Sequence, residues 1–208
     1  KYLNTSESPL FSKGTQLYGL NVAKESLTRG SRLVLVEGYM DVVCLYRHGF
    51  SQVVASLGTA FTRQQARLIR RYTTDVVVAY DADAAGQSAA MRGIELLNDE
   101  GINVAVASLP QGYDPDSYVQ EHGLESFRRI VDTSAPLIEY KLNEAIKKAD
   151  LETVEGKVRA VEAALPILLS IESAVGREGY IEMTAEMLGV TVAALKDEVR
   201  RFQANQAR

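Results

Sequence analysis

Residues 32–38, RLVLVEG, and residues 75–83, DVVVAYDAD, decide the fold of this 208-residue chain. Each holds a short run of Val, Leu or Ala and ends on carboxylates. Such runs are typical of buried strands in a parallel sheet whose two faces are both covered. Two further runs, QVVAS at 52–56 and NVAVAS at 103–108, have the same character. Helices are predicted between the runs, over 39–48, 63–72 and 84–100. The alternation predicts an α/β fold with βαβ units.

The pattern changes near residues 110–116, after which no further strand is predicted. The chain is therefore divided into a connecting segment at 1–30, with a helix over 15–29, an α/β domain at 31–112 and an all-helical subdomain at 113–208. The helices expected in the last part are 116–148, 151–170, 173–188 and 191–206.

The composition is that of an ordinary soluble globular protein, with 46% apolar and 24% charged residues. No apolar run is long enough to span a membrane. Cys44 is the one cysteine, which excludes an internal disulfide, and with only His48 and His122 beside it no zinc site is expected. The chain starts on a polar stretch without Met, so we interpret it as a cytosolic segment of a longer polypeptide.

Charge is distributed unevenly along the chain, although the net charge is only −4. Residues 1–80 hold ten Lys or Arg and five Asp or Glu, whereas residues 81–208 hold 13 and 22. Such asymmetry has two interpretations: a first half that faces a polyanion, or charge that simply scatters along a soluble chain.

Acidic residues follow the ends of the predicted strands, where a parallel α/β sheet has its functional edge. Because close carboxylates repel one another, divalent cations are the simplest way to hold them together. An oxygen-only ligand set suits Mg²⁺ or Mn²⁺, and Gly38 allows close backbone approach. The alternative is that these acids only cap helices. The candidate ligands are Glu37, Asp41, Asp81, Asp83, Asp114 and Asp116.

The spacing of Glu37-Gly38 and Asp81-x-Asp83 resembles the TOPRIM module shared by topoisomerases and bacterial primases, a compact parallel sheet flanked by helices. Further stretches are similar to bacterial replicative DNA primases. They are KYLNTSESPLFSKG at 1–14, LYGL at 17–20, VEGYMDVV at 36–43, VASLGTAFT at 54–62, YDADAAG at 80–86 and GYDPDSYV at 112–119. The specific resemblance covers about residues 1–148.

The resemblance implies a part of a polymerase core that makes short RNA primers on single-stranded DNA from ribonucleoside triphosphates. It implies Glu37, Asp81 and Asp83 as catalytic, metal-binding acids, with Asp41, Asp114 and Asp116 at the same edge. Lys1, Lys13 and Gly38 match positions that face nucleotide or template. Implied partners are the replicative helicase and single-strand-binding protein at a bacterial replication fork in the cytoplasm.

The resemblance also carries expectations about what the chain lacks. The zinc ribbon and the upstream half of the polymerase region, with its basic groove, are not in this sequence. We do not expect residues beyond 150 to form the helicase-binding domain. Little activity is therefore expected from this segment alone.

Residues 63–71, RQQARLIRR, form a predicted helix with Arg63, Arg67 and Arg70 on one face. The stripe has two interpretations: a contact to the phosphate backbone of DNA, or a solvated helix face that pairs with acids of the tail.

Other classes of protein remain as alternatives. Another TOPRIM protein, a topoisomerase or a nuclease, shares the acids, but no tyrosine has the context of a topoisomerase nucleophile. A receiver-type signalling domain also gathers acids, with a different arrangement. A third alternative is a non-catalytic module whose helical tail binds a partner. Cys44 is expected to be a buried core residue, and His48 a helix C-terminal cap.

Overall fold

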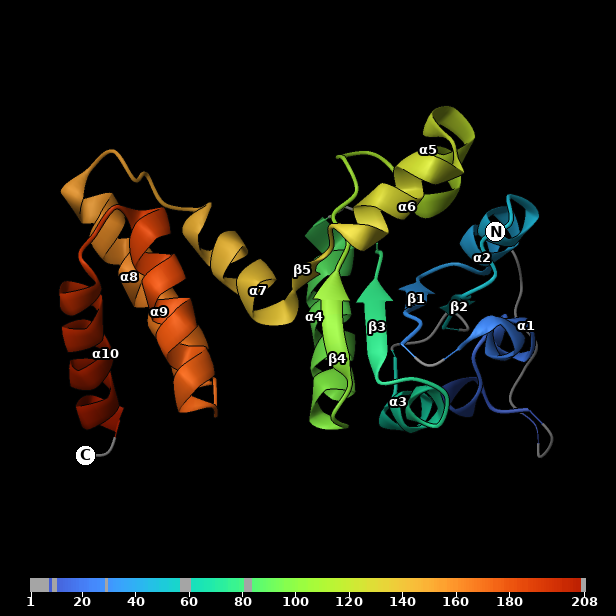
Figure 1. The fold of residues 1–208 in the computed structure, drawn as a ribbon, viewed down its shortest axis with the longest axis horizontal. Helices are drawn as coiled ribbons and strands as arrows, with labels where there is room; N and C mark the ends of the chain where they lie inside the picture. The colour runs from blue at the N-terminus through green and yellow to red at the C-terminus, as the bar shows by residue number, and fades with distance from the viewer. Residues whose placement is uncertain (1–7, 9–10, 29, 57–60, 81–83, 207–208) are drawn as a thin grey trace. The chain divides into compact units, whose positions relative to one another are not determined.

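The computed structural model describes residues 8, 11–28, 30–56, 61–80 and 84–206 (Figure 1). Asp81, Asp83 and Lys1, which the sequence places in the site, lie outside the described residues. The chain divides into a first unit, Lys1–Leu137, and a second unit, Ile138–Arg208. The sequence puts the change to helices near 112, whereas this division by contacts falls 25 residues later, within a helix.

The first unit is built on a five-stranded sheet with the order β2-β1-β3-β4-β5. Strands β1 to β4 are mutually parallel, and β5 runs antiparallel to β4. Every residue of β1 and β2 is buried, as predicted for strands covered on both faces. The α/β fold class is thereby confirmed. The strands are β1 (Leu33–Val36), β2 (Val53–Ala55), β3 (Asp75–Val78), β4 (Asn103–Val106) and β5 (Ala135–Pro136).

Helices cover both faces of this sheet. One face packs Val34 and Val36 into a core with α2, α5 and α6, where Phe50 meets Phe127 edge to face. Helix α4 contacts β4 and lies behind it in Figure 1, beside α3. Helix α1 contacts β2. The elements are the 3-10 helix η1 (Lys13–Thr15), α1 (Leu20–Ser26), α2 (Tyr39–Arg47), α3 (Arg63–Arg70), α4 (Ala84–Asp99), α5 (Pro115–His122) and α6 (Leu124–Asp132).

The prediction of one helix over 116–148 with no later strand is wrong. Gly123 has a φ of +79°, which ends α5 and starts α6 in a new direction. Ala135 precedes Pro136, and a residue before proline avoids the helical region. Ala135 therefore adopts an extended conformation and pairs with Val106 as strand β5.

The predicted helix over 15–29 is shorter in the structure. Gly19 has a φ of +83° and immediately precedes α1, so the helix begins only at Leu20. Tyr18, on the other side of Gly19, pairs antiparallel with Ala55 and covers the outer edge of β2. A Cβ on Gly19 would lie 2.8 Å from Val42 Cγ1, so the close approach also requires glycine.

The second unit is helical, as predicted, and has its own core. Leu142, Leu168, Leu195 and Val199 are buried together there. Among the described residues, no helix combines the length and hydrophobicity that a membrane crossing needs. The helices are α7 (Leu137–Ile146), α8 (Val154–Leu169), α9 (Ala174–Leu188) and α10 (Val192–Gln206).

Candidate active site

The ends of β1 and β3 form the carboxyl edge of the sheet, by which we mean the edge where the four parallel strands end. Leu35 of β1 lies opposite Val78 of β3, and the Ala79 N–H donates to the Leu35 carbonyl at 2.9 Å. This register brings Glu37 and Tyr80 to the same edge. Asp81 and Asp83 directly follow Tyr80 in the sequence.

Glu37 is half-buried at this edge, and its charge affects the pKa of the Tyr80 phenol. Burial raises the pKa of the Tyr80 phenol, and the negative charge of Glu37 adds to the rise. A tyrosine phenol is already neutral at neutral pH, and this shift keeps Tyr80 neutral at higher pH as well. Tyr80 was not predictable as a site residue, because a tyrosine after an apolar run carries no distinguishing pattern.

Gly38 starts α2 in close contact with the side chain of Asp41. Its N–H donates to Asp41 Oδ2 at 3.0 Å. The Gly38 φ of −101° is one that any residue adopts, so backbone conformation does not require glycine here. A Cβ would lie 2.8 Å from Asp41 Oδ2, closer than real Cβ contacts come. The glycine of the Glu-Gly pair is thus explained by the carboxylate beside it.

Asp41 is 6% exposed, and both of its carboxylate oxygens accept backbone N–H groups. The second donor is the Asp116 N–H, which lies 3.2 Å from Asp41 Oδ1. The structure therefore brings together the predicted residues Gly38, Asp41 and Asp116.

Asp114 and Asp116 lie at the start of α5 and are half-buried. Asp114 is the N-cap: its Oδ1 accepts the Ser117 N–H at 2.7 Å and faces Ser117 Oγ at 2.5 Å. Asp116 Oδ1 accepts the Gln120 amide at 2.5 Å. Within the described ranges, no three acidic, His or Cys side chains are grouped closely enough to hold a metal ion.

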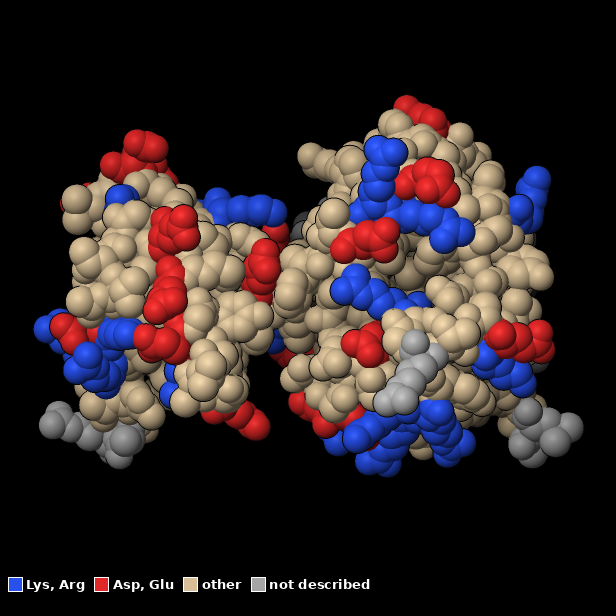
Figure 2. Space-filling view, viewed as in Figure 1, with Lys and Arg blue, Asp and Glu red and all other residues tan. Residues whose placement is uncertain are grey.

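The arginine stripe on α3 pairs with the end of α4 rather than with the helical tail. Arg63 Nη2 lies 3.4 Å from Asp99 Oδ2, and Arg67 Nε lies 3.2 Å from Glu100 Oε2. Arg70 donates to the Glu100 carbonyl. Figure 2 shows Lys and Arg gathered over α3 with acidic side chains beside them. The stripe is thus partly neutralised, while Arg63 and Arg67 keep more than half of their side-chain surface exposed, at 52% and 61%.

Lys13 lies in η1, which packs on α3. Gln65, fully buried, donates its side-chain amide to the carbonyls of Lys13 and Gln16 at 2.9 and 2.8 Å. This glutamine fixes the segment that carries Lys13 against α3. No pattern in the sequence indicates this role, since a glutamine in a basic helix predicts exposure.

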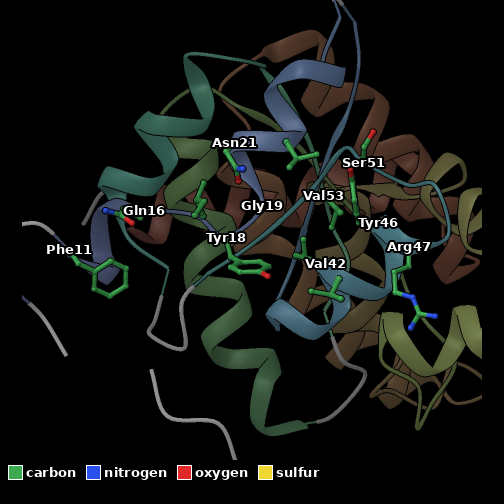
Figure 3. Close-up of a pocket in the computed structure, with 13 residues that line it drawn as sticks. Phe11, Gln16, Tyr18, Gly19, Asn21, Val42, Tyr46, Arg47, Ser51 and Val53 are labelled. Carbon is green, nitrogen blue, oxygen red and sulfur yellow. The ribbon is translucent and has the colours of Figure 1, made fainter. Parts of the chain in front are cut away.

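A cavity of about 510 Å³ lies along the outer side of α2, between that helix and the segment before α1 (Figure 3). Its rim carries the exposed rings of Tyr18 and Tyr46, while Leu17, Val42 and Val53 are buried in its wall. This cavity was not predictable from the sequence, because its lining comes from separate segments.

Cys44 is buried, and His48 is the C-terminal cap of α2, as expected for both. Burial, and then the neighbouring Asp116, raise the pKa of the Cys44 thiol to about 12. A thiol that is neutral at physiological pH is a poor nucleophile.

Two family models match the chain. Residues 34–119 match the Toprim-like family, and residues 138–193 match the DnaB-helicase binding domain of primase. The chain thus combines a Toprim-like α/β unit with a helical unit of the helicase-binding class. The expectation that the helicase-binding domain is absent is wrong, because apolar periodicity alone does not distinguish such a domain from any other small bundle.

The particular proteins that the chain resembles are bacterial DNA primases. It is 39% identical to the DNA primase of Clostridium acetobutylicum over 197 residues, which is 95% of this chain and 33% of the relative. For the DNA primase of Escherichia coli K12 the identity is 39% over 174 residues, 82% of this chain and 30% of the relative. The chain is therefore homologous to bacterial DNA primases and spans about a third of the length of these relatives.

Solved primase structures share the fold. The RNA polymerase domain of Mycobacterium tuberculosis primase DnaG, in complex with double-stranded DNA, gives a TM-score of 0.79 at 31% identity, over 92% of this chain and 62% of that one. A DnaG primase catalytic domain bound to ssDNA gives 0.75 at 35% identity, over 93% and 62%. The TOPRIM fold expected from the sequence is confirmed.

Proposed function

We propose that the chain is the Toprim part of a polymerase core that synthesises short RNA primers on single-stranded DNA. The observation that carries the proposal is homology to DNA primases over nearly the whole chain, with Glu37-Gly38 at the carboxyl edge of the sheet. The substrates are ribonucleoside triphosphates, and the reaction is nucleotidyl transfer to the 3′-hydroxyl of the RNA primer. The chain acts with its template at the bacterial replication fork, as part of the primosome in the cytoplasm.

The acids of the carboxyl edge suit Mg²⁺ or Mn²⁺. Glu37 is half-buried there and offers carboxylate oxygens, the donors that these cations prefer. We expect Glu37, Asp81 and Asp83 to hold the cations, completed by Asp114 or Asp116 and with no zinc involved. When bound, such cations offset the charge of the triphosphate and of the pyrophosphate that leaves.

The residues of the chain itself bind and orient the reactants. Glu37 acts either as a ligand or as the general base for the primer 3′-hydroxyl. Lys1 and Lys13 face the nucleotide or the template strand. Arg63, Arg67 and Arg70 contribute to template binding less than their number suggests, because Asp99 and Glu100 neutralise part of their charge.

Primer synthesis by a primase polypeptide that carries this chain tests the proposal. Asp81→Ala and Asp83→Ala are each expected to abolish RNA products while the circular dichroism spectrum stays unchanged. Asp75→Ala is the matched control, because Asp75 lies at the opposite end of β3 from the carboxyl edge. Full activity in either edge variant would contradict the metal assignment. Relaxation or cleavage of DNA without RNA products would favour a topoisomerase or a nuclease instead.

We infer that the second unit binds the replicative helicase. The match of residues 138–193 to the helicase-binding family supports this function. Co-elution of the chain with the cognate helicase in gel filtration is the expected result, and separate elution at micromolar concentrations would contradict it. Single-strand-binding protein is a further partner of the whole primase.

A further inference from the structure

Asp41 satisfies backbone donors at the starts of two different helices. Gly38, whose N–H bonds to Oδ2, is the N-cap of α2, and Asp116, whose N–H bonds to Oδ1, is in the first turn of α5. N–H groups at helix starts have no carbonyl partner in the backbone of their own helix, so each needs another acceptor, such as a side chain. One buried carboxylate supplies both, from within the first turn of α2.

The segments that Asp41 joins are those that carry the acids of the proposed active site. Glu37 directly precedes Gly38, and Asp114 lies two residues before Asp116. Asp41 and Asp116 are 75 residues apart in sequence, so the bond is a tertiary contact and not a feature of one turn. Helices α2 and α5 also pack on each other, with Cys44 Sγ 3.8 Å from the Asp116 carbonyl.

A second observation shows that the carboxylate has a fixed place. The Cβ that any other residue would have at position 38 would lie 2.8 Å from Asp41 Oδ2. The turn after β1 is therefore shaped around this oxygen, because Gly38 has no backbone requirement of its own. The oxygen, the glycine and the start of α5 form one interlocked arrangement.

We propose that Asp41 is a positioning residue that sets the separation between Glu37 and the acids at the start of α5, and that it is not itself a metal ligand. This inference rests on the proposed function of the same edge. Hydrogen bonds from backbone N–H groups to a buried carboxylate are strong and directional, so the two acid-bearing segments are held in one geometry. Asparagine at position 41 keeps the side-chain volume, but its N–H₂ group faces one of the two backbone N–H groups and cannot accept a hydrogen bond from it.

The test compares Asp41→Asn with a destabilised control, Val131→Ala, which removes buried volume in α6, a helix that carries none of the acids of the proposed site. Mn²⁺ binding is measured on the chain itself by electron paramagnetic resonance. Primer synthesis is measured at saturating Mn²⁺ in a primase polypeptide that carries the chain. The rates of primer synthesis by both variants are measured at a temperature well below their unfolding midpoints.

Asp41→Asn is expected to bind as many Mn²⁺ ions as the wild type, and to lower kcat at least about tenfold, because a misplacement of about 1 Å among reacting groups costs up to about 100-fold in rate. Val131→Ala is expected to stay within about twofold of the wild-type kcat. Loss of a bound Mn²⁺ in Asp41→Asn would make Asp41 a ligand and overturn the inference. So would a rate above a tenth of wild type, or an equal loss in the control. A wild type without RNA products would overturn the proposed function, and this inference with it.

Discussion

The contact between Gly38 and Asp41 predicts a specific outcome for Gly38→Ala. The backbone at Gly38, with φ −101° and ψ 146°, is accessible to alanine, so the substitution adds no conformational strain. The new Cβ would lie 2.8 Å from Asp41 Oδ2. Since the carboxylate is buried and held at both oxygens, it cannot move without breaking a hydrogen bond.

The expected magnitude follows from that bond. A hydrogen bond to a charged group contributes about 1.5–3 kcal/mol to stability, so Gly38→Ala should lower the free energy of unfolding of the first unit by about 2 kcal/mol. Asp41→Ala leaves two N–H groups without their acceptor and should cost about 3 kcal/mol or more. In that background the oxygen is gone, and Gly38→Ala should cost less than about 0.5 kcal/mol.

Urea unfolding of the wild type, of the two single variants and of the double variant measures these free energies of unfolding, with tyrosine fluorescence as the signal. Eight of the ten tyrosines lie in the first unit, so the signal reports mainly on the unit that contains the contact. A coupling free energy of about 2 kcal/mol between the two positions is expected. Additive costs within about 0.5 kcal/mol would refute the explanation of the glycine by the carboxylate.

Three further results are expected. Cys44, with its pKa raised to about 12, should react with a disulfide reagent at pH 8 at least about 100-fold more slowly in the folded chain than in urea, because the neutral thiol is not the nucleophile. Glu100→Gln should release Arg67 and tighten binding of a single-stranded oligonucleotide about twofold at low salt in fluorescence anisotropy, with a smaller effect at high salt. Gly179 lies within α9 and has open space where a Cβ would be, so Gly179→Ala should stabilise the second unit by about 0.5–1 kcal/mol. A Cβ on Gly156 would overlap the Asp150 carbonyl, so Gly156→Ala should destabilise the same unit. Thermal unfolding measures both effects.

Each of these three results has an outcome that would contradict it. Equal labelling rates with and without urea would show an accessible thiolate at Cys44. Unchanged oligonucleotide binding in Glu100→Gln, matched by the exposed control Glu152→Gln, would show that the ion pair does not limit phosphate contacts. A loss of stability in Gly179→Ala would show that the outer face of α9 is packed.

The pH dependence of Cys44 follows from the same shift. Its pKa is raised from 9.0 in the unfolded chain to about 12 in the folded one, so the folded state favours the neutral thiol. The corresponding stability is fully present below pH 9 and is lost as pH rises towards 12. Urea titrations at pH 8 and pH 10.5 should therefore give a lower midpoint at the higher pH. A smaller drop in Cys44→Ala would assign the difference to this thiol.

The four parallel strands were predictable because each is a buried apolar run that only a covered sheet accommodates. Strand β5 was not, since two residues carry no periodicity and their extended geometry depends on Pro136 and on pairing with Val106. Residues 124–132 were predicted as helix, but the break at Gly123 was not, because a single glycine inside a helical pattern has no fixed meaning.

The site was predictable to the extent that strand ends meet at one edge. The sequence placed Glu37, Asp41 and Asp116 at that edge, but it did not show that Asp41 bonds to two backbone N–H groups. The pairing of Arg67 with Glu100 was equally hidden, because it depends on how α3 packs beside α4. Such tertiary contacts join residues whose separation in sequence varies freely.

Mn²⁺ titration of the wild-type chain and of Asp81→Ala, by calorimetry, tests the central claim most directly. The account predicts that Mn²⁺ binds to the wild type, and that Asp81→Ala loses this binding while its circular dichroism spectrum is unchanged. Equal Mn²⁺ binding by both chains would contradict a metal site at the carboxyl edge, and with it the assignment of these acids to nucleotidyl transfer.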